Sequence, residues 1–263
     1  MRLHYLLLAS TCLAAQVSDP VAAKLVAPTG TLRAVFLAAN PVQGRVDPKT
    51  GAVRGVAIDL ARELGRRLGV PVSIRGVAGM RAMEEGFANH TLDIAFLAFD
   101  PTRATSMDFS NVYDLSWSSY LVPVNSPLHA VADADRPGIR IGAATGASPE
   151  LFLSRNIRNA EIERYASPSA ADALRMLAAG EIDAYAANRQ RLIEMAANAP
   201  DTRVLPDNYS AVLQAIAVTK GNVPALTVIN RFLNDRRASG FIQAAIDRAG
   251  LTGAVDVAPF LKK

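Results

Sequence analysis

The strongest constraint in this sequence is a regular alternation of strand-like and helix-like segments in its first hundred residues. Short apolar runs typical of buried strands occur at residues 32–38, 70–74 and 93–99. Between them, residues 57–68 and 80–87 carry apolar side chains at helical spacing. The order strand, helix, strand, helix, strand predicts a parallel sheet with helices on its faces.

The same pattern restarts in the second half of the chain. Strand-like runs at 138–145 and 182–187 alternate with helix-like segments at 149–156, 171–177 and 189–196. Ser167 and Pro168 are typical of a helix N-cap and first turn. Extended segments at 119–128 and 211–222 connect the units, and two helices, 224–237 and 241–249, end the chain. The sequence therefore predicts two α/β units with two extended connections.

The N-terminus has the order of features found in export signals. Arg2 and His4 precede an apolar stretch at residues 5–15 that is too short to span a bilayer. The small residues Val21 and Ala23 fit a signal-peptidase site and predict cleavage before Lys24, which makes residues 1–23 a signal peptide. A buried N-terminal helix is the alternative, and the order of charge, apolar core and small residues favours export.

Cysteine usage agrees with an exported protein. Cys12 is the only cysteine, and the residues before it make a poor lipid-attachment motif. The mature chain therefore contains no cysteine, which suits an oxidising compartment without a disulfide framework. His90 and His129 stand without metal-ligand spacing, so we expect no metal and no cofactor.

Charge and composition argue against nucleic-acid binding. The formal net charge is +4, the basic residues are spread over the chain, and aromatic residues make up only 6%. A nucleic-acid interface would gather lysines and arginines in a stripe with interleaved aromatics. The mild positive charge instead favours anionic ligands.

Several segments together resemble family 3 of the bacterial extracellular solute-binding proteins, the receptors of polar amino-acid ABC transporters. They are GVAIDLARELGRRLGV, LDIAFLAFDPTRATSMDFSNVY, GAATGASPELFL, AGEIDAYAANR, and IAVTKGN followed by INRFLNDRRASGFIQ. The resemblance implies a type II periplasmic binding protein fold: two α/β lobes, each a mixed, mostly parallel sheet flanked by helices, joined by two hinge strands. With it, we expect lobe 1 to hold residues 24–122 and 215–263, and lobe 2 to hold residues 123–214.

Arg103 is the first candidate for ligand binding. It follows Asp100 and Pro101, which predict a helix start, and a guanidinium beside a helix N-terminus suits a carboxylate. The resemblance implies that this arginine holds the ligand carboxylate. The alternative is a surface arginine paired with Asp100 or Asp108. At the end of the preceding strand, Ala98 and Phe99 stand where the family often supplies hydroxyls or carbonyls.

In the second unit, Gly146, Ala147 and Ser148 precede a helix, where backbone amides and the Ser148 hydroxyl predict an anion cradle. Ser148 could equally be an N-cap, and both roles are compatible. Asn188 stands where amino-acid-binding relatives usually carry an aspartate for the ligand's α-amino group. An amide brings no charge to balance an ammonium, which favours a carboxylate or a ligand with an amide or weakly charged nitrogen.

The first loop supplies further candidates. Asn40 and Gln43 could face the ligand or stabilise the loop. Phe36 could cover the ligand, but its place in a strand favours the core.

The predicted function is a periplasmic solute-binding protein that captures a small polar, carboxylate-bearing ligand and delivers it to an ABC transporter permease. We expect a monomer that binds no nucleic acid and catalyses no reaction. One alternative is a periplasmic dehydratase on the same fold, but Asn188 cannot titrate and no hydrolase or nucleotide motif is present. The other is a sensory module that docks a membrane receptor.

Overall fold

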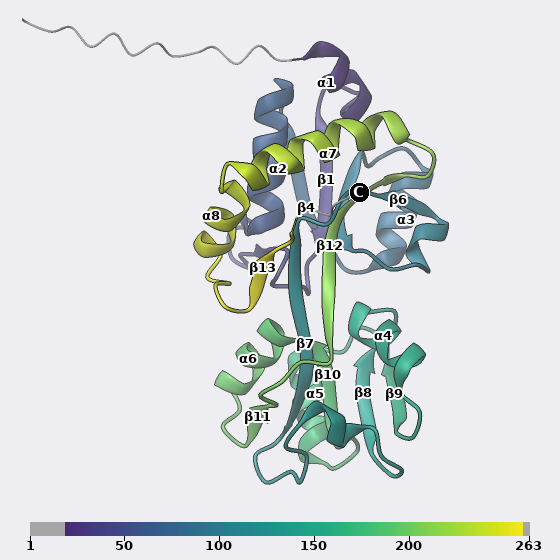
Figure 1. The fold of residues 1–263 in the computed structure, drawn as a ribbon, viewed down its shortest axis with the longest axis vertical. Helices are drawn as coiled ribbons and strands as arrows, with labels where there is room; N and C mark the ends of the chain where they lie inside the picture. Colours follow the sequence, from purple (N-terminus) through teal and green to yellow (C-terminus); the bar gives the residue numbers. More distant parts are fainter. Residues whose placement is uncertain (1–18, 260–263) are drawn as a thin grey trace, which may run out of the picture.

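The structure is a computed structural model and describes residues 19–259. It has two lobes, and two long antiparallel strands, β7 (Asp114–Pro123) and β12 (Ser210–Thr219), run between them (Figure 1). These strands correspond to the two predicted extended connections. The lobes share one mixed sheet with the strand order β4-β1-β5-β12-β7-β10-β8-β9.

Lobe 1 contains the first predicted unit and the last two helices of the described residues. Its sheet has β1 (Leu32–Leu37) at the centre, parallel to both β4 (Val72–Val77) and β5 (Ile94–Ala98), while β12 runs antiparallel to β5. The smaller strands are β2 (Arg45–Val46), β3 (Val53–Arg54), β6 (Met107–Phe109) and β13 (Val255–Val257). The helices are α1 (Pro20–Val26), α2 (Val56–Leu68), α3 (Met80–Ala88), α7 (Val223–Ala238) and α8 (Phe241–Arg248).

The alternation of side chains along β5 divides the core of lobe 1 into two layers. Ile94 and Phe96 pack with the helices on one face of the sheet, and Ala95 and Leu97 pack with α3 on the other. This period of two is the geometry of a strand buried on both faces. The last two helices, α7 and α8, pack in the same cluster as α2, so they belong to lobe 1.

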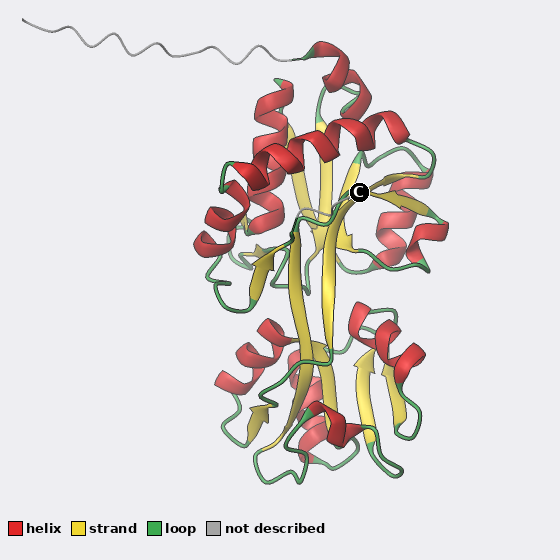
Figure 2. Cartoon of the chain, viewed as in Figure 1, coloured by secondary structure: helices red, strands yellow, loops and turns green. Residues whose placement is uncertain are grey.

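Lobe 2 repeats the plan on a smaller scale (Figure 2). Its strands are β8 (Arg140–Ala144), β9 (Glu161–Tyr165), β10 (Ala184–Asn188) and β11 (Thr202–Val204), and its helices are α4 (Ser148–Asn156), α5 (Ala170–Ala178) and α6 (Arg189–Ala197). Two 3-10 turns, η1 (Arg103–Thr105) in lobe 1 and η2 (Val131–Ala134) in lobe 2, complete the elements. β8 is parallel to β9 and β10, whereas β10 is antiparallel to β7.

The predicted start of helix α5 is wrong by two residues. Its N-cap is Ser169, whose hydroxyl accepts a hydrogen bond from the Asp172 amide while the Asp172 carboxylate accepts from the Ser169 amide. This reciprocal capping box satisfies two amides at once. Ser167 instead adopts a positive φ of 47° in the turn before the helix.

The predicted signal peptide lies mostly outside the described residues, as does Cys12. The predicted cleavage point before Lys24 falls within helix α1, which Asp19 caps by accepting hydrogen bonds from the amides of Val21 and Ala22. Val26, near its end, is buried in the core of lobe 1. Within residues 19–259, none of the helices combines the length and the apolar character needed to cross a bilayer.

Candidate functional site

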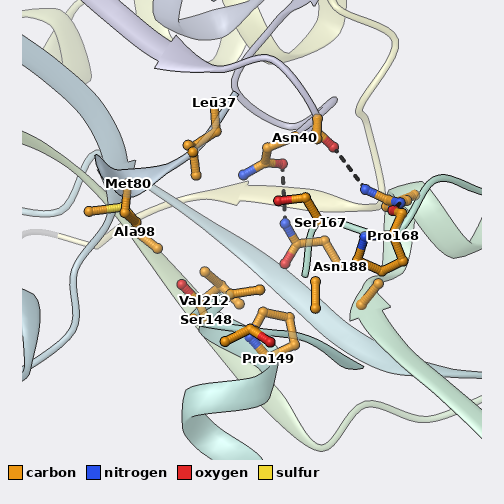
Figure 3. Close-up of a pocket in the computed structure, with 18 of the residues that line it drawn as sticks. Leu37, Asn40, Met80, Ala98, Ser148, Pro149, Ser167, Pro168, Asn188 and Val212 are labelled. Carbon is orange, nitrogen blue, oxygen red and sulfur yellow. Dashed lines mark hydrogen bonds between the residues drawn. The ribbon is translucent and has the colours of Figure 1, made fainter. Parts of the chain in front are cut away.

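A cavity of about 170 Å³ lies between the two lobes (Figure 3). A cavity of similar size can hold a molecule such as benzene, so this space suits a small solute. Five segments contribute most of its lining: the loop after β1, the end of β5 with η1, the turn between β8 and α4, the turn before α5, and the end of β10 with the start of α6.

Arg103 joins the two lobes at this cavity. Its Nη1 donates to the Ala98 carbonyl in lobe 1 at 2.9 Å and to Ser148 Oγ in lobe 2 at 3.1 Å, and its Nη2 donates to the Gly146 carbonyl at 2.7 Å. Arg103 is only 6% exposed, and its Nε is buried without a hydrogen-bond partner. Burial lowers the pKa of the guanidinium, against the opposing charges of Asp100 and Glu84.

The acids that could have neutralised Arg103 have other partners. Asp100 forms an ion pair with Arg155 at 2.8 Å, and Asp108 forms one with Lys220 at 2.8 Å. The alternative of a surface arginine paired with Asp100 or Asp108 is therefore wrong. The three acceptors described above are all neutral, so no carboxylate in the described part of the chain forms a direct ion pair with Arg103.

The turn before α4 brings Ser148 to the cavity. Gly146 has a φ of +70°, which favours glycine, and the helix begins at Ser148 with Ala147 in the N-cap position. Ser148 is thus not the N-cap. The Gly146 amide donates to Glu150 Oε2 at 3.0 Å and the Ala147 amide donates to the Ala144 carbonyl at 3.1 Å. The amides of Gly146 and Ala147 are therefore not available to an anion, and of the predicted anion cradle only Ser148 remains. Ala147 still lines the cavity.

Asn40 and Asn188 form a second contact between the lobes. Asn188 Nδ2 donates to Asn40 Oδ1 at 3.1 Å, and the Val42 amide donates to the same Oδ1 at 3.1 Å. Asn188 Oδ1 is buried without a hydrogen-bond partner. Figure 3 shows the Asn188 side chain between Asn40 on one side and Ser148 and Pro149 on the other.

Gln43 lines the cavity but uses its polar atoms to hold the loop. It is fully buried, its Oε1 accepts from the Leu37 amide at 3.0 Å, and its Nε2 donates to Gln214 Oε1 at 3.0 Å. Gln214 Nε2 in turn donates to Ser116 Oγ at 3.1 Å. Gln43 therefore ties the loop after β1 to both long strands.

The remaining candidates separate into three places. Ala98 lines the cavity, and its carbonyl accepts from Arg103. Phe99 does not line it; the ring lies against Phe109, with centroids 5.4 Å apart. Because side chains alternate along a strand, neighbours at the end of β5 face opposite sides. Phe36 is fully buried in the core of lobe 1, the position that its place in a strand favoured.

Sequence reasoning missed four polar residues of the lining, namely Thr145, Ser167, Tyr185 and Arg191. Arg191 reaches the cavity from the first turn of α6 and donates from Nη2 to the Pro168 carbonyl at 2.9 Å. Its spacing of three residues from Asn188 was a usable signal, because residues three apart share a helix face. Ser167 and Tyr185 carried no such signal in the sequence. In the structure, burial raises the pKa of the Tyr185 hydroxyl, and the positive charge of Arg191 acts in the opposite direction.

Two ion pairs connect the lobes on either side of the cavity. Asp100 and Arg155 line a hollow that shares Ser148 with the cavity, and Arg45 and Glu194 line another that shares Arg191. Arg45 Nη1 donates to Glu194 Oε2 at 3.1 Å. Together with the bonds of Arg103 and Asn188, these pairs describe a closed arrangement of the two lobes.

Comparison with known proteins agrees with this architecture. L-cystine-binding protein TcyJ from Escherichia coli (strain K12) is 24% identical over 204 residues, which cover 75% of this chain and 74% of that protein. A crystal structure of a mutant of ArgBP from T. maritima matches with a TM-score of 0.71 and 22% identity, covering 87% of this chain and 99% of that one.

A further structural match is the ancestral amino acid-binding protein AncCDT-1, a precursor of cyclohexadienyl dehydratase. Its TM-score is 0.69 at 22% identity, covering 85% of this chain and 96% of that one. At such identity the two structural matches show the fold, a type II periplasmic binding protein. Residues 33–250 also match the family described as bacterial extracellular solute-binding proteins, family 3. The chain therefore belongs to this family.

Proposed function

We propose that this protein captures a small carboxylate-bearing ligand, an amino acid or a related compound, between its lobes and delivers it to an ABC transporter permease. The observation that carries this proposal is Arg103, a buried cation at the interlobe cavity without a carboxylate partner among the described residues. An unmatched buried charge is costly, and a ligand carboxylate would neutralise it with charge-assisted hydrogen bonds. The family and TcyJ support transport of a solute of this kind.

The proposed motion is a hinge in the two long strands. Tyr113 packs in the core of lobe 1, whereas Tyr120 and Val122 pack with lobe 2. We therefore place the hinge on β7 between Tyr113 and Tyr120, earlier in the chain than the lobe boundary at residue 122 that the sequence predicts. A ligand that contacts both lobes favours the closed state by its differential affinity for that state. The permease would then recognise the closed form.

The composition of the cavity supports binding rather than catalysis. A general acid or base needs a titratable group within reach of the substrate. No Asp, Glu or His is among the described residues that line the cavity. The nearby Glu150 is held by Arg164: burial raises its pKa, but Ser154, Arg164 and the Gly146 amide outweigh burial and keep it below its usual value. We therefore propose a binding protein, not a dehydratase.

We further propose that the protein acts as a monomer in the periplasm after cleavage before Lys24. The order of charged, apolar and small residues at the N-terminus supports export. After such cleavage, Val26 would still pack against lobe 1.

The direct test is a thermal-shift and calorimetric screen of the mature protein with amino acids, dicarboxylates, amides and small amines. A ligand that binds only the folded state raises the unfolding temperature by mass action. We expect a carboxylate-bearing compound to do so, and to be recovered chemically unchanged by NMR after incubation. The proposal is wrong if amines without a carboxylate bind best, or if the bound compound is converted to a product.

A further inference from the structure

Among the described residues, the charged side chains that line the cavity are all cationic. Arg103 and Arg191 are the charged side chains among the described residues that line it. Both donate hydrogen bonds to neutral groups: Arg103 to two carbonyls and a hydroxyl, and Arg191 to two carbonyls. The cavity is therefore cationic, and a group with a positive charge would enter it against repulsion.

The acids nearest to the cavity do not alter this balance. Asp100 is paired with Arg155, Glu150 with Arg164, and Glu194 with Arg45. Glu84, the other acid that acts on Arg103, is exposed on α3 and screened by solvent. A free ammonium in the cavity would thus have no unpaired carboxylate beside it.

The hydrogen bonds of Asn40 determine which atom of Asn188 is available. The Val42 amide can only donate, so the Asn40 atom that it contacts must be the carbonyl oxygen. The Asn188 atom that contacts the same oxygen must then be the amide nitrogen. This leaves Asn188 Oδ1, buried and without a partner, as an acceptor on the cavity side, where Figure 3 places Ser148 and Pro149.

An unpartnered buried acceptor at a cationic cavity requires a donor that brings no positive charge. We infer that the ligand is a carboxylate that carries an uncharged N–H or O–H donor and no ammonium group, such as a 2-hydroxy acid or an N-acylated amino acid. The carboxylate binds Arg103, and the donor binds Asn188 Oδ1. This inference rests on the proposed function and narrows its ligand class.

The test compares four forms of one carbon skeleton by isothermal titration calorimetry at pH 7. The alanine series is L-alanine, N-acetyl-L-alanine, L-lactate and propionate, and matching series are made for leucine and glutamate. In the series that binds, we expect the hydroxy or the N-acetyl form to bind at least tenfold more tightly than both the amino form and the form with neither group.

Each other outcome has a defined meaning. If the amino form binds as tightly or more tightly, the inference is overturned while the proposed function stands. If the form with neither group binds as well as the hydroxy form, the role of Asn188 Oδ1 is overturned. If no form of any series binds, the inference and the proposed function fail together.

Asn188→Asp provides the second arm. The new carboxylate should raise the affinity for the amino form at least tenfold and lower the affinity for the hydroxy and N-acetyl forms, because it supplies the missing negative charge. Asn89→Asp makes the same change of charge at an exposed position after α3 and should leave every affinity unchanged. If Asn188→Asp changes the affinity for none of the four forms, Asn188 Oδ1 is not the acceptor that contacts the ligand. The ligand series on the unmodified protein decides the question if the variant does not fold.

Discussion

Asp100 of lobe 1 and Arg155 of lobe 2 form an ion pair at 2.8 Å, in which the Asp100 side chain is 4% exposed and the Arg155 side chain 46%. Burial raises the pKa of Asp100, but Arg155 and the Thr102 amide outweigh this effect and hold the pKa below its usual value. The pair therefore persists at neutral pH and weakens as the pH falls through this lowered pKa.

Arg155→Ala should shift the equilibrium toward the open form. Because Arg155 is half exposed, we expect a modest effect, about 0.5–1 kcal/mol, or a two- to fivefold increase in Kd for the ligand at low salt. Small-angle scattering and calorimetry at two salt concentrations would measure it. Arg231→Ala, an exposed change on α7, is the matched control. Equal effects of the two variants would contradict a role of the ion pair in closure.

Arg103→Ala should remove the main anion contact. We expect a loss of about 2–5 kcal/mol of ligand affinity, as for truncation of one partner of a buried charged pair. Arg103→Lys should lose part of this affinity, since it keeps the charge without the planar fork. The unfolding temperature without ligand should change little, because the guanidinium lies at the cavity rather than in a core cluster. Ligand binding by Arg103→Ala at full affinity would remove Arg103 from the site.

Gln43→Ala should act on stability rather than directly on the ligand. It leaves the part-buried Leu37 amide and the fully buried Gln214 Oε1 without their partners. A buried orphan group such as Gln214 Oε1 costs about 1–3 kcal/mol, so urea unfolding should show a loss of this order. The matched control is Gln243→Ala on the exposed face of α8, where little change is expected. A stable Gln43→Ala variant would show that the network is dispensable.

Asp114→Asn should change how stability depends on pH. Asp114 is fully buried on β7 with both carboxylate oxygens unpartnered, and burial raises its pKa well above the usual value. The protonated form is then favoured in the folded state. Its contribution to stability is complete below the unfolded pKa, about 3.9, and is lost as the pH rises toward the folded pKa, at up to ~1.4 kcal/mol per pH unit.

The asparagine variant has no proton to lose at this position. We therefore expect it to be more stable than the parent protein at pH 7 and to gain little or nothing at pH 4. Urea unfolding between pH 4 and pH 8 would measure the difference. Parallel stability curves for the two proteins would show that Asp114 does not titrate in this range.

Local sequence patterns determined the elements of the fold. The strand period along residues 94–97 and the helical period along residues 57–68 reflect contacts between near neighbours, so they can be read from the chain. The start of α5 was harder to predict, because Ser167 and Ser169 both suit an N-cap. Ser169 is the N-cap because Asp172, three residues later, completes a capping box with it. The family segments then implied the order of the lobes and the position of Arg103.

Tertiary structure alone decided which polar atoms remain available to a ligand. Gln43 and Asn40 are both polar residues of the same loop. The Gln43 amide is hydrogen-bonded to Gln214, 171 positions away, whereas Asn40 is hydrogen-bonded to Asn188, 148 positions away. The Gln43 bond forms when lobe 1 folds, because Gln214 pairs with Ala98 of β5, whereas the Asn40 bond needs the two lobes to close. No local period encodes either bond. For the same physical reason, the partner of Asp100 proved to be Arg155 and not the neighbouring Arg103.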